Sequence, residues 1–543
     1  MPLLTELPAE LLHHIFVDVD PRDLGRLPRV CNKFKIHVQG NRKLWQDVYL
    51  RLLDKPQNDD QLDWEQALRD VVRLQLICAR ETTAGKEPEL PFVHQTMTQL
   101  LRRASSLGHT NVNSNTHSAS RNAELLRKLV EQEPSTAAAF LERSFLFEHV
   151  HSVYRQVVTN PTDAAAGVTT TTTTVADTET RQRSAHLHCL YGKAIQTTSA
   201  DGLGTYPYAC SAVYDMRGHT AATRWGPFRP DGSMRVDWEK VEAVMVVLGY
   251  NARCKRITVS LFSDIWATPF SGSWAGSFLP DPHASPSASP PSALKLADPY
   301  GITGTWYRVV CFLDYNDFFG FNFPPGDQMP AGQPRPGINV GEATRLIVLK
   351  LHVTKIEDPG PEDGQELPVV HFTGLSRMLE EDFDPSPSSI LKGTVRLTRE
   401  GEVRWTSYSI FNGEERWKSE AIQVGGVRSA RGVVGFWFDS DYDAHGPVGP
   451  TALWKVSDSL EPYATAAALP PDLLVYSGLL GYGSDFEGEM DYEAGGDDDD
   501  EDDEMDEEEE GIDNEALQGE LPALLLEANM DIVTIVPPGE GEN

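Results

Sequence analysis

The chain has few cysteines and no long apolar run, and both absences limit its class. Its 543 residues include six cysteines, widely separated and without a Cys-x-x-Cys pair. This usage favours reduced thiols over a secreted disulfide framework. No stretch approaches the roughly 18 apolar residues that a membrane-spanning helix needs, and the N-terminus lacks the basic and apolar regions of a signal peptide. The sequence therefore predicts a soluble intracellular protein, cytoplasmic, nuclear or both.

Catalytic and metal-binding patterns are also missing. The sequence contains no Gly-x-Ser-x-Gly, no His-Glu-x-x-His, no Walker loop and no Gly-x-Gly-x-x-Gly between a strand and a helix. Residues 439–450 begin like a calcium loop, but Ala444 and Pro450 stand where that loop needs Gly and Glu, which favours an exposed turn. His186 and His188 are spaced for one face of a strand, without a second ligand pair. We therefore expect no enzyme activity, no cofactor and no metal.

Basic residues are absent beyond Lys455. The chain carries 81 acidic and 47 basic residues, a net charge of −34, and 28 of the acids lie beyond Lys455. Residues 1–455 therefore have a net charge of only −6, which gives no sign of a nucleic-acid-binding surface. Of the 26 residues from Asp485 to Glu510, 18 are acidic, and such a run repels itself. We expect residues 458–543 to form a disordered acidic tail.

The most informative pattern is at the N-terminus, where four short blocks each indicate a helix. Pro8 suits a helix start because its missing N–H would be unpaired there. Asp20 adds a capping carboxylate before a second proline, and Asn41 precedes a further amphipathic segment. The blocks are Leu7-Pro8-Ala9-Glu10-Leu11-Leu12, Asp20-Pro21-Arg22-Asp23-Leu24, Val30-Cys31-Asn32-Lys33-Phe34 and Leu44-Trp45. They predict three or four helices within residues 1–50.

In residue type and spacing, the four blocks resemble the F-box. The resemblance implies that residues 1–50 dock on the Skp-type adaptor of an SCF (Skp, cullin, F-box) ubiquitin ligase and, through it, on a cullin. A domain this small buries too little surface to be very stable alone. An ordinary helical hairpin would bury similar leucines, but four blocks in order favour the F-box. The residues expected to contact the adaptor are Leu7, Pro8, Leu11, Leu12, Ile15, Phe16, Leu24, Leu27, Val30, Cys31, Phe34, Leu44 and Trp45.

Helical periodicity continues beyond the F-box. Residues 51–158 are interpreted as a helical connector, in which Ser135 is a candidate N-cap. Residues 159–185 include a run of threonines from 169 to 174, a composition that forms no core and predicts a flexible linker. The helices expected in the connector lie near 62–80, 92–104, 121–132 and 135–158.

From His186 onward, short β-branched and aromatic runs alternate with turns rich in Gly, Pro and Asp. This pattern favours an antiparallel barrel or sandwich over a parallel α/β sheet. Residues 186–457 are therefore expected to form a β-rich recognition domain, which makes the chain an α+β multidomain protein. The ten expected strands are 187–195, 209–214, 241–250, 257–262, 306–312, 346–353, 393–397, 403–411, 433–438 and 452–456.

Three segments of this domain, 206–238, 428–438 and 445–450, are dense in aromatic, Arg and Gly residues. With them, residues 186–457 are similar to the carboxy-terminal domain of a group of filamentous-fungal F-box proteins. A barrel mouth lined by Arg and Trp suits a peptide, because planar Arg pairs with carboxylates and stacks on rings. Alternatively, the aromatic residues pack the core. The residues predicted to contact a protein substrate are Arg217, Trp225, Arg428, Arg431, Trp437 and His445.

The sequence thus favours a non-catalytic substrate-recognition subunit of an SCF-type E3 ubiquitin ligase, which contributes proximity between substrate and ubiquitin. The alternative is a small-ligand-binding or hydrolytic β-barrel with a regulatory F-box. The tail also has two interpretations, because apolar clusters at 521–526 and 532–536 follow its acidic run. It either solubilises the protein or docks on a partner.

Overall fold

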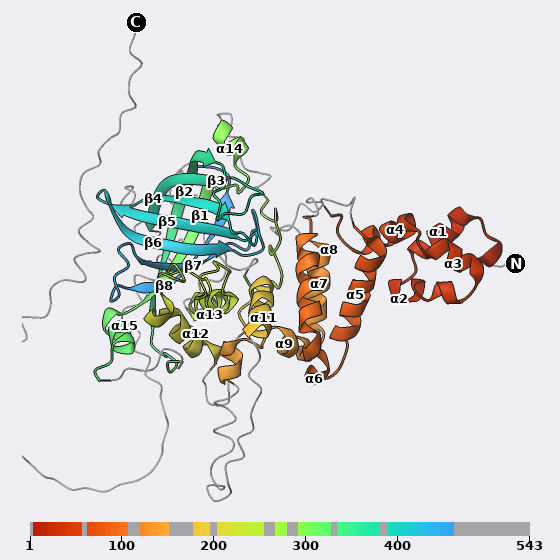
Figure 1. Cartoon of the computed structure of the whole chain (residues 1–543), viewed down its shortest axis with the longest axis horizontal. Helices are drawn as coiled ribbons and strands as arrows, with labels where there is room; N and C mark the ends of the chain where they lie inside the picture. The colour runs from red at the N-terminus through yellow and green to blue at the C-terminus, as the bar shows by residue number, and fades with distance from the viewer. Residues whose placement is uncertain are drawn as a thin grey trace, which may run out of the picture.

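The computed structural model consists of an N-terminal helical arm and a β-barrel with helices packed beneath it (Figure 1). The predicted order of N-terminal helices followed by an antiparallel β-barrel is confirmed. Most of the predicted linker, the expected strand at 257–262 and the tail beyond residue 460 lie outside the described residues. The structure describes residues 4–56, 62–106, 120–150, 178–195, 204–254, 266–279, 292–326, 334–378 and 389–460.

The arm begins with six short helical segments, and two of them start at the caps that the sequence indicates. The backbone N–H of Arg22 donates to Asp20 Oδ1 (2.8 Å), and that of Leu44 donates to Asn41 Oδ1 (3.1 Å). These bonds satisfy N–H groups that lack a partner within the helix. The segments are η1 (Leu4–Glu6), α1 (Ala9–Val17), α2 (Pro21–Leu24), η2 (Leu27–Arg29), α3 (Asn32–Val38) and α4 (Arg42–Leu52).

The connector helices follow, close to their predicted positions except for the last. The helix expected at 135–158 starts at Pro134, one residue before the predicted cap Ser135, and ends at Phe140. A separate helical segment covers residues 145–150. The helices are α5 (Trp64–Cys78), α6 (Thr83–Lys86), η3 (Glu87–Glu89), α7 (Leu90–Arg102), α8 (Arg121–Glu131) and α9 (Pro134–Phe140).

Three of the expected strands are wrong, because the segments at 187–195, 209–214 and 241–250 lie mostly in helices. The helices are α11 (Thr178–Tyr191), α12 (Thr205–Tyr214) and α13 (Trp238–Cys254). α13 is packed between α11, α12 and the barrel, and seven of its residues from Val241 to Leu248 are buried apolar side chains. A helix that is apolar on all sides lacks the 3.6-residue alternation of apolar and polar residues, so its sequence cannot be told from that of a buried strand.

α11 also corrects two other expectations. It starts at Thr178, so the predicted boundary at His186 falls inside a helix, and residues 178–185 are not a linker. The two histidines do not share a face: His186 stacks on Trp238 (ring centroids 3.9 Å apart), whereas His188 Nδ1 lies 2.6 Å from Glu242 Oε1. The spacing that suits a metal on a strand therefore brings no ligand pair together on this helix.

Eight antiparallel strands form a closed barrel in which each strand pairs with the next and β8 pairs with β1. Six of them match expected strands. β3 and β6 were missed, because β6 opens with charged residues and β3 carries polar residues among its apolar ones. The strands are β1 (Gly304–Leu313), β2 (Glu342–Glu357), β3 (Val369–Met378), β4 (Ser389–Leu397), β5 (Val403–Phe411), β6 (Glu414–Gln423), β7 (Val433–Asp439) and β8 (Val448–Ser457).

The strands bury two separate apolar faces. Inward side chains such as Leu351, Phe372 and Trp405 fill the barrel. Outward side chains of β7, including Phe436 and Phe438, belong to a second core that continues through the helices into the arm. Burial on both faces explains why β7 is a continuous apolar run rather than an alternating one.

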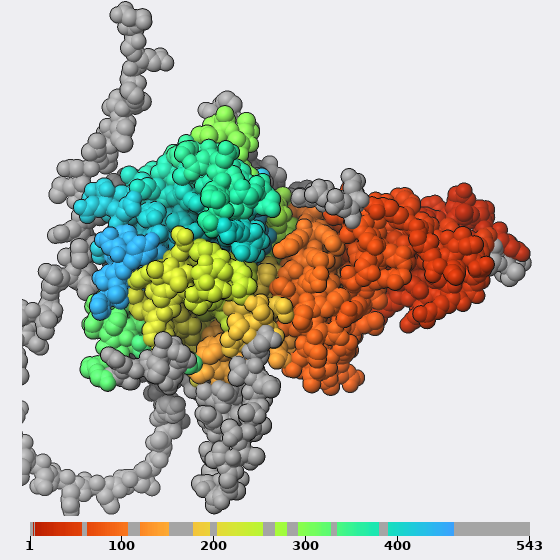
Figure 2. All heavy atoms as spheres, viewed as in Figure 1, coloured from red at the N-terminus to blue at the C-terminus, as the bar shows by residue number. Residues whose placement is uncertain are grey.

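The two ends of the barrel face different surroundings. One end of the barrel carries the turns 398–402 and 424–432. Glu402 in the first of these turns interacts with the charge of Arg102 at the C-terminus of α7, so we call this the proximal end. We call distal the opposite end, formed by the connections 314–341, which includes α15 (Tyr315–Asn322), and 440–447. The F-box region and α15 lie at opposite extremes of the molecule (Figures 1 and 2).

Candidate functional site

The N-terminal helices pack around one aromatic side chain. Phe16 makes edge contacts with Phe34 and His37, with ring centroids 5.1 and 5.5 Å apart. Trp45 Nε1 donates to the carbonyl of Val38 (3.1 Å) and so ties α4 to the end of α3. Six of the thirteen predicted adaptor contacts are buried in this core and hold the domain together. They are Leu12, Phe16, Leu24, Phe34, Leu44 and Trp45.

Other predicted contacts lie on the surface. Leu11 and Ile15, one helical turn apart on α1, are 50% and 40% exposed, and Pro8 at the N-cap is also exposed. We call these three residues the α1 stripe. Val30 is exposed as well, whereas the remaining predicted contacts are partly buried against the core. These partly buried residues are Leu7, Leu27 and Cys31.

Ile36 on α3 is the exposed apolar residue that the sequence analysis missed. It is 76% exposed and stands between Lys35 and His37, so no apolar spacing singles it out. Its position two residues after Phe34 turns it away from the core face of α3. Val30, just before α3, is also exposed, so both residues add apolar surface to the F-box region.

Polar contacts fix how α1 lies against α4. The Asp47 carboxylate lies 2.9 Å from His13 Nε2 and accepts a hydrogen bond from Lys43 Nζ (2.7 Å). Burial alone would raise the pKa of Asp47, but these two hydrogen-bonded partners outweigh it and lower that pKa. Burial, together with the neighbouring charges of His13 and Lys33, lowers the pKa of His37. His13 thus faces α4 within the domain, whereas the α1 stripe is exposed on α1.

A buried carboxylate joins this domain to the connector. Asp54, just after α4, is 1% exposed and accepts hydrogen bonds from Ser120 Oγ (2.5 Å) and the backbone N–H of Arg121 (2.9 Å) and Ser105 (3.2 Å). Its own N–H donates to Asn122 Oδ1 (3.0 Å). The end of α4 is therefore locked to α7 and α8. Sequence reasoning missed Asp54, because its partners are 51 to 68 positions away.

A groove lies between the N-terminal helices and α5. Its volume is about 350 Å³. Three cations, Arg29, Lys35 and Arg69, contribute to it, and Arg69 pairs with Glu65 at 2.5 Å. The groove is large enough to accept side chains of a protein docked on the adjacent helices. The lining residues are Gly25, Pro28, Arg29, Lys35, Val38, Gln39, Trp45, Glu65 and Arg69.

The two arginines predicted to contact substrate on the 424–432 turn lie at the proximal end. Arg431 is 2% exposed and donates from Nε to Ser273 Oγ (3.0 Å) and from Nη2 to the carbonyl of Tyr191 (3.4 Å). Burial lowers its pKa to about 9. Arg431 thus ties the barrel to α11. Arg428 is exposed beside Gly301.

The other four predicted contacts lie away from the proximal end. Trp437 is buried, and its Nε1 donates to the carbonyl of Cys311 (3.0 Å). Trp225 is buried against Phe438. Arg217 pairs with Asp215 (2.6 Å), and His445 is exposed on the 440–447 connection. The six residues therefore do not form a single mouth, and the two that are exposed, Arg428 and His445, lie at opposite ends of β7.

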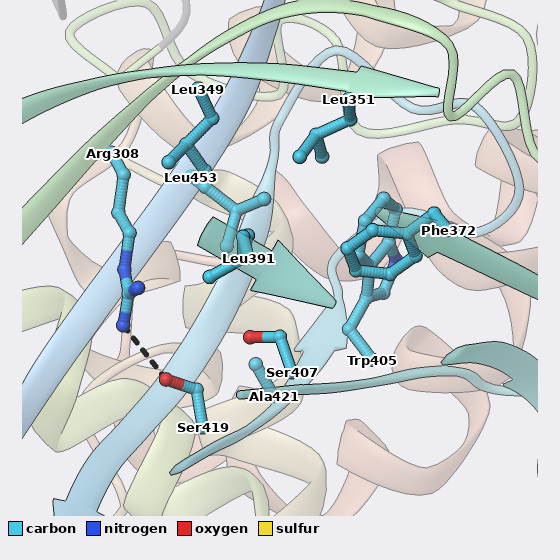
Figure 3. A pocket seen from close by; sticks show the side chains of 10 residues that line it. All are labelled: Arg308, Leu349, Leu351, Phe372, Leu391, Trp405, Ser407, Ser419, Ala421 and Leu453. Carbon is cyan, nitrogen blue, oxygen red and sulfur yellow. Dashed lines mark hydrogen bonds between the residues drawn. The ribbon is translucent and has the colours of Figure 1, made fainter. Parts of the chain in front are cut away.

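The barrel interior is filled by side chains (Figure 3). The cavity that remains has a volume of about 10 Å³, enough for roughly one water molecule, whereas ligand sites usually measure about 300–1,000 Å³. Arg308 lies beside it and donates to Thr451 Oγ1 (3.0 Å) and Ser419 Oγ (2.7 Å). Burial lowers the pKa of Arg308 to about 10. This interior gives no support to the alternative of a small-ligand barrel.

The N-terminal helices form a packed unit with outward apolar side chains, joined to a longer arm through buried contacts. Comparison with known families identifies it: the F-box-like family model matches residues 4–51, from η1 to the last turn of α4. The chain is therefore an F-box domain-containing protein, as its N-terminal blocks predict. No curated protein and no solved structure matches the chain, so the similarity to fungal F-box proteins stays a prediction.

Within the described residues, no group of three or more His, Cys, Asp and Glu side chains could hold a metal ion. Among the helices that the structure describes, none is long and apolar enough to span a membrane.

Proposed function

We propose that this protein is the substrate-recognition subunit of an SCF-type ubiquitin ligase. The α1 stripe binds a Skp-type adaptor and, through it, a cullin, while the barrel domain holds a protein substrate. The observation that carries the proposal is the exposed α1 stripe on an F-box-like domain. An apolar surface of this kind on a small domain is typical of a protein-binding site.

The arrangement of the arm supports these separate roles for the F-box and the barrel domain. Asp54 and the edge contact between Tyr49 and Trp64 (5.1 Å) join the F-box to the connector through buried groups. The apolar core continues from α4 through α5 and α7 to α11. A rigid arm of this kind holds a bound substrate at a set position relative to the ligase, which raises the effective concentration of its lysines near ubiquitin.

The proposed subunit is non-catalytic and works in the cytosol, the nucleus or both. Ubiquitin transfer belongs to other subunits of such a ligase, so the chain needs no nucleophile or metal of its own. The structure has free thiols at Cys31, Cys78, Cys189, Cys210 and Cys311. Free thiols support a reducing compartment.

The adaptor surface is tested by Leu11→Asp with Ile15→Asp in the full chain. Both side chains are exposed, so the melting temperature should stay within a few degrees of wild type. Two carboxylates in a dry interface lack partners, and the loss of one anchor costs about 2 kcal/mol or more. We therefore expect adaptor affinity, measured by pull-down and calorimetry, to fall at least about 100-fold.

A matched control is Leu76→Asp, which places a carboxylate on an equally exposed leucine of α5. It should leave adaptor binding unchanged. Leu12→Asp is unsuitable as a test, because Leu12 is fully buried and its replacement unfolds the domain. Wild-type adaptor capture by the folded Leu11→Asp, Ile15→Asp variant would overturn the proposed function.

A further inference from the structure

The distal end of the barrel carries an insertion that barrel closure does not need. β1 and β2 pair up to Leu313 and Glu342, yet residues 314–341 separate them. At the same end, β5 and β6 are joined by Asn412 and Gly413 alone, which is the length that a tight hairpin uses. Long insertions in compact domains are usually functional.

One side of the inserted helix α15 is packed, and the other presents rings. Phe318 and Asn322 are buried, whereas Tyr315 and Phe319 are 38% and 39% exposed. The rings of Tyr315 and Phe319 lie 5.9 Å apart, and those of Phe319 and Phe323 lie 5.0 Å apart. The row ends at the exposed His445 of the 440–447 connection, whose ring lies 4.7 Å from that of Phe323.

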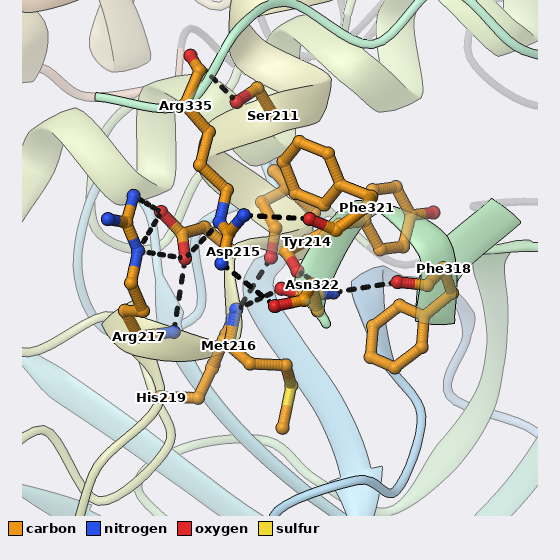
Figure 4. A network of polar contacts seen from close by, with 11 residues as sticks. Ser211, Tyr214, Asp215, Met216, Arg217, His219, Phe318, Phe321, Asn322 and Arg335 are labelled. Atoms are coloured by element: carbon orange, nitrogen blue, oxygen red, sulfur yellow. Dashed lines mark hydrogen bonds and ion pairs between the residues drawn. The ribbon is translucent and has the colours of Figure 1, made fainter. Parts of the chain in front are cut away.

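Hydrogen bonds hold α15 against α12 (Figure 4). The Arg335 guanidinium donates to the carbonyls of Phe321 (2.7 Å) and Asn322 (2.9 Å), which closes the C-terminal end of α15. Asn322 also donates to the carbonyl of Tyr214 (3.0 Å) and accepts from the N–H of Met216 (3.0 Å). The exposed rings of α15 therefore sit on a rigid support.

Asp215 completes that support. It lies between Arg217 (2.6 Å) and Arg335 (3.4 Å). Burial would raise the pKa of Asp215, but its bonds to Arg217 outweigh burial and lower that pKa. Asp215 therefore stays ionised near neutral pH and keeps Arg335 in place beneath α15.

The two segments that carry these rings contain acidic but no basic residues. Residues 314–323 and 439–447 contain five aspartates and no Lys or Arg. Asp439 is buried and lies 3.8 Å from Arg416. The other four aspartates are exposed around the rings. They are Asp314, Asp317, Asp441 and Asp443.

We propose that Tyr315, Phe319, Phe323 and His445, with these four exposed aspartates, bind a Lys- and Arg-rich segment of the protein substrate. We call this set the distal aromatic surface. Ring faces attract cations, and guanidinium groups both stack on rings and pair with carboxylates. The inference rests on the proposed function, since it names the chemistry of the substrate. It also places the substrate at the far end of the molecule from the α1 stripe (Figure 1).

The test uses the full chain and a probe peptide of alternating Ser, Lys and Arg. A zero-length carbodiimide links each peptide amine to a carboxylate that it touches, and mass spectrometry locates the links. The acidic run 485–510 also attracts the peptide, so its links serve as an internal reference. We expect links at Asp314, Asp317, Asp441 or Asp443, and a loss of at least fivefold in Tyr315→Ala with Phe319→Ala, while the links to 485–510 stay constant.

The matched control is Leu375→Ala with Ile390→Ala, an exposed apolar pair on neighbouring strands of the barrel wall. It should leave the distal links unchanged. If the ring variant is unstable, Asp317→Asn with Asp441→Asn keeps both rings and should reduce links to Asp314 and Asp443. Links confined to 485–510, or distal links at wild-type level in the folded variants, would refute the surface. Adaptor capture by these variants is a separate readout, which tests the proposed function alone.

Discussion

At the residue scale, Glu239 near the start of α13 illustrates the cost of a buried carboxylate. Its Oε1 accepts from the backbone N–H of Phe145 (2.7 Å), and its side chain lies 3.6 Å from Arg181. Burial nevertheless raises the pKa of Glu239 from 4.5 to about 7. The folded state therefore holds a proton that the unfolded state releases between these two values. This contribution to stability is fully present below about pH 4.5 and is lost as the pH rises to about 7.

Glu239→Gln should remove that pH dependence. Glutamine keeps the acceptor for Phe145 and has no charge to desolvate. Relative to the variant, wild type should lose about 2 kcal/mol of unfolding free energy between pH 5.5 and pH 8. Urea unfolding of both proteins at the two pH values measures the difference. Parallel pH profiles would contradict the raised pKa of Glu239.

At the element scale, the junction between the F-box and the connector depends on Asp54. Asp54→Ala leaves the Ser120 hydroxyl and the N–H groups of Ser105 and Arg121 without their acceptor. Each buried donor that loses its acceptor costs about 1–3 kcal/mol. We expect a stability loss of at least about 2 kcal/mol and faster hydrogen exchange in residues 52–56 and 120–123.

Adaptor binding provides the control for that change. The α1 stripe lies on α1, away from the junction, so the Asp54→Ala variant should still capture the adaptor at a temperature where the F-box is folded. Asp54→Asn, which retains one carbonyl acceptor, should be less destabilised than the alanine variant. Unchanged exchange in 52–56 would show that Asp54 does not lock the two elements together.

At the scale of the whole molecule, charge is separated along the chain. The acidic run 485–510 contrasts with residues 1–455, whose net charge is −6. Deleting residues 485–543 should leave adaptor capture unchanged, because the proposed adaptor surface, the α1 stripe, is apolar and lies outside the deleted segment. If the tail docks on a basic partner, the deletion should also remove an interaction that weakens with salt. Pull-downs of both proteins at two salt concentrations measure the two effects, and loss of adaptor capture on deletion would contradict the expectation.

The sequence by itself determined the features that depend on neighbouring residues. Asp20 and Asn41 form their caps with N–H groups two or three positions away, so the F-box helices were predictable and the family match confirms them. The strand period likewise revealed six of the eight barrel strands. Signals of this kind involve residues close together in the sequence, so they can be read without any tertiary contact.

Only the tertiary structure decided features that depend on distant residues. α13 reads as a strand because burial on every side removed its period. Leu11 and Leu12 are adjacent in the sequence, yet Leu12 lies in the core and Leu11 on the surface. The packing of α1 against the other helices decides which of the two is buried. The contact between α15 and His445 joins segments more than 100 positions apart. No local pattern records such contacts, because residues far apart in the sequence come together only when the chain folds.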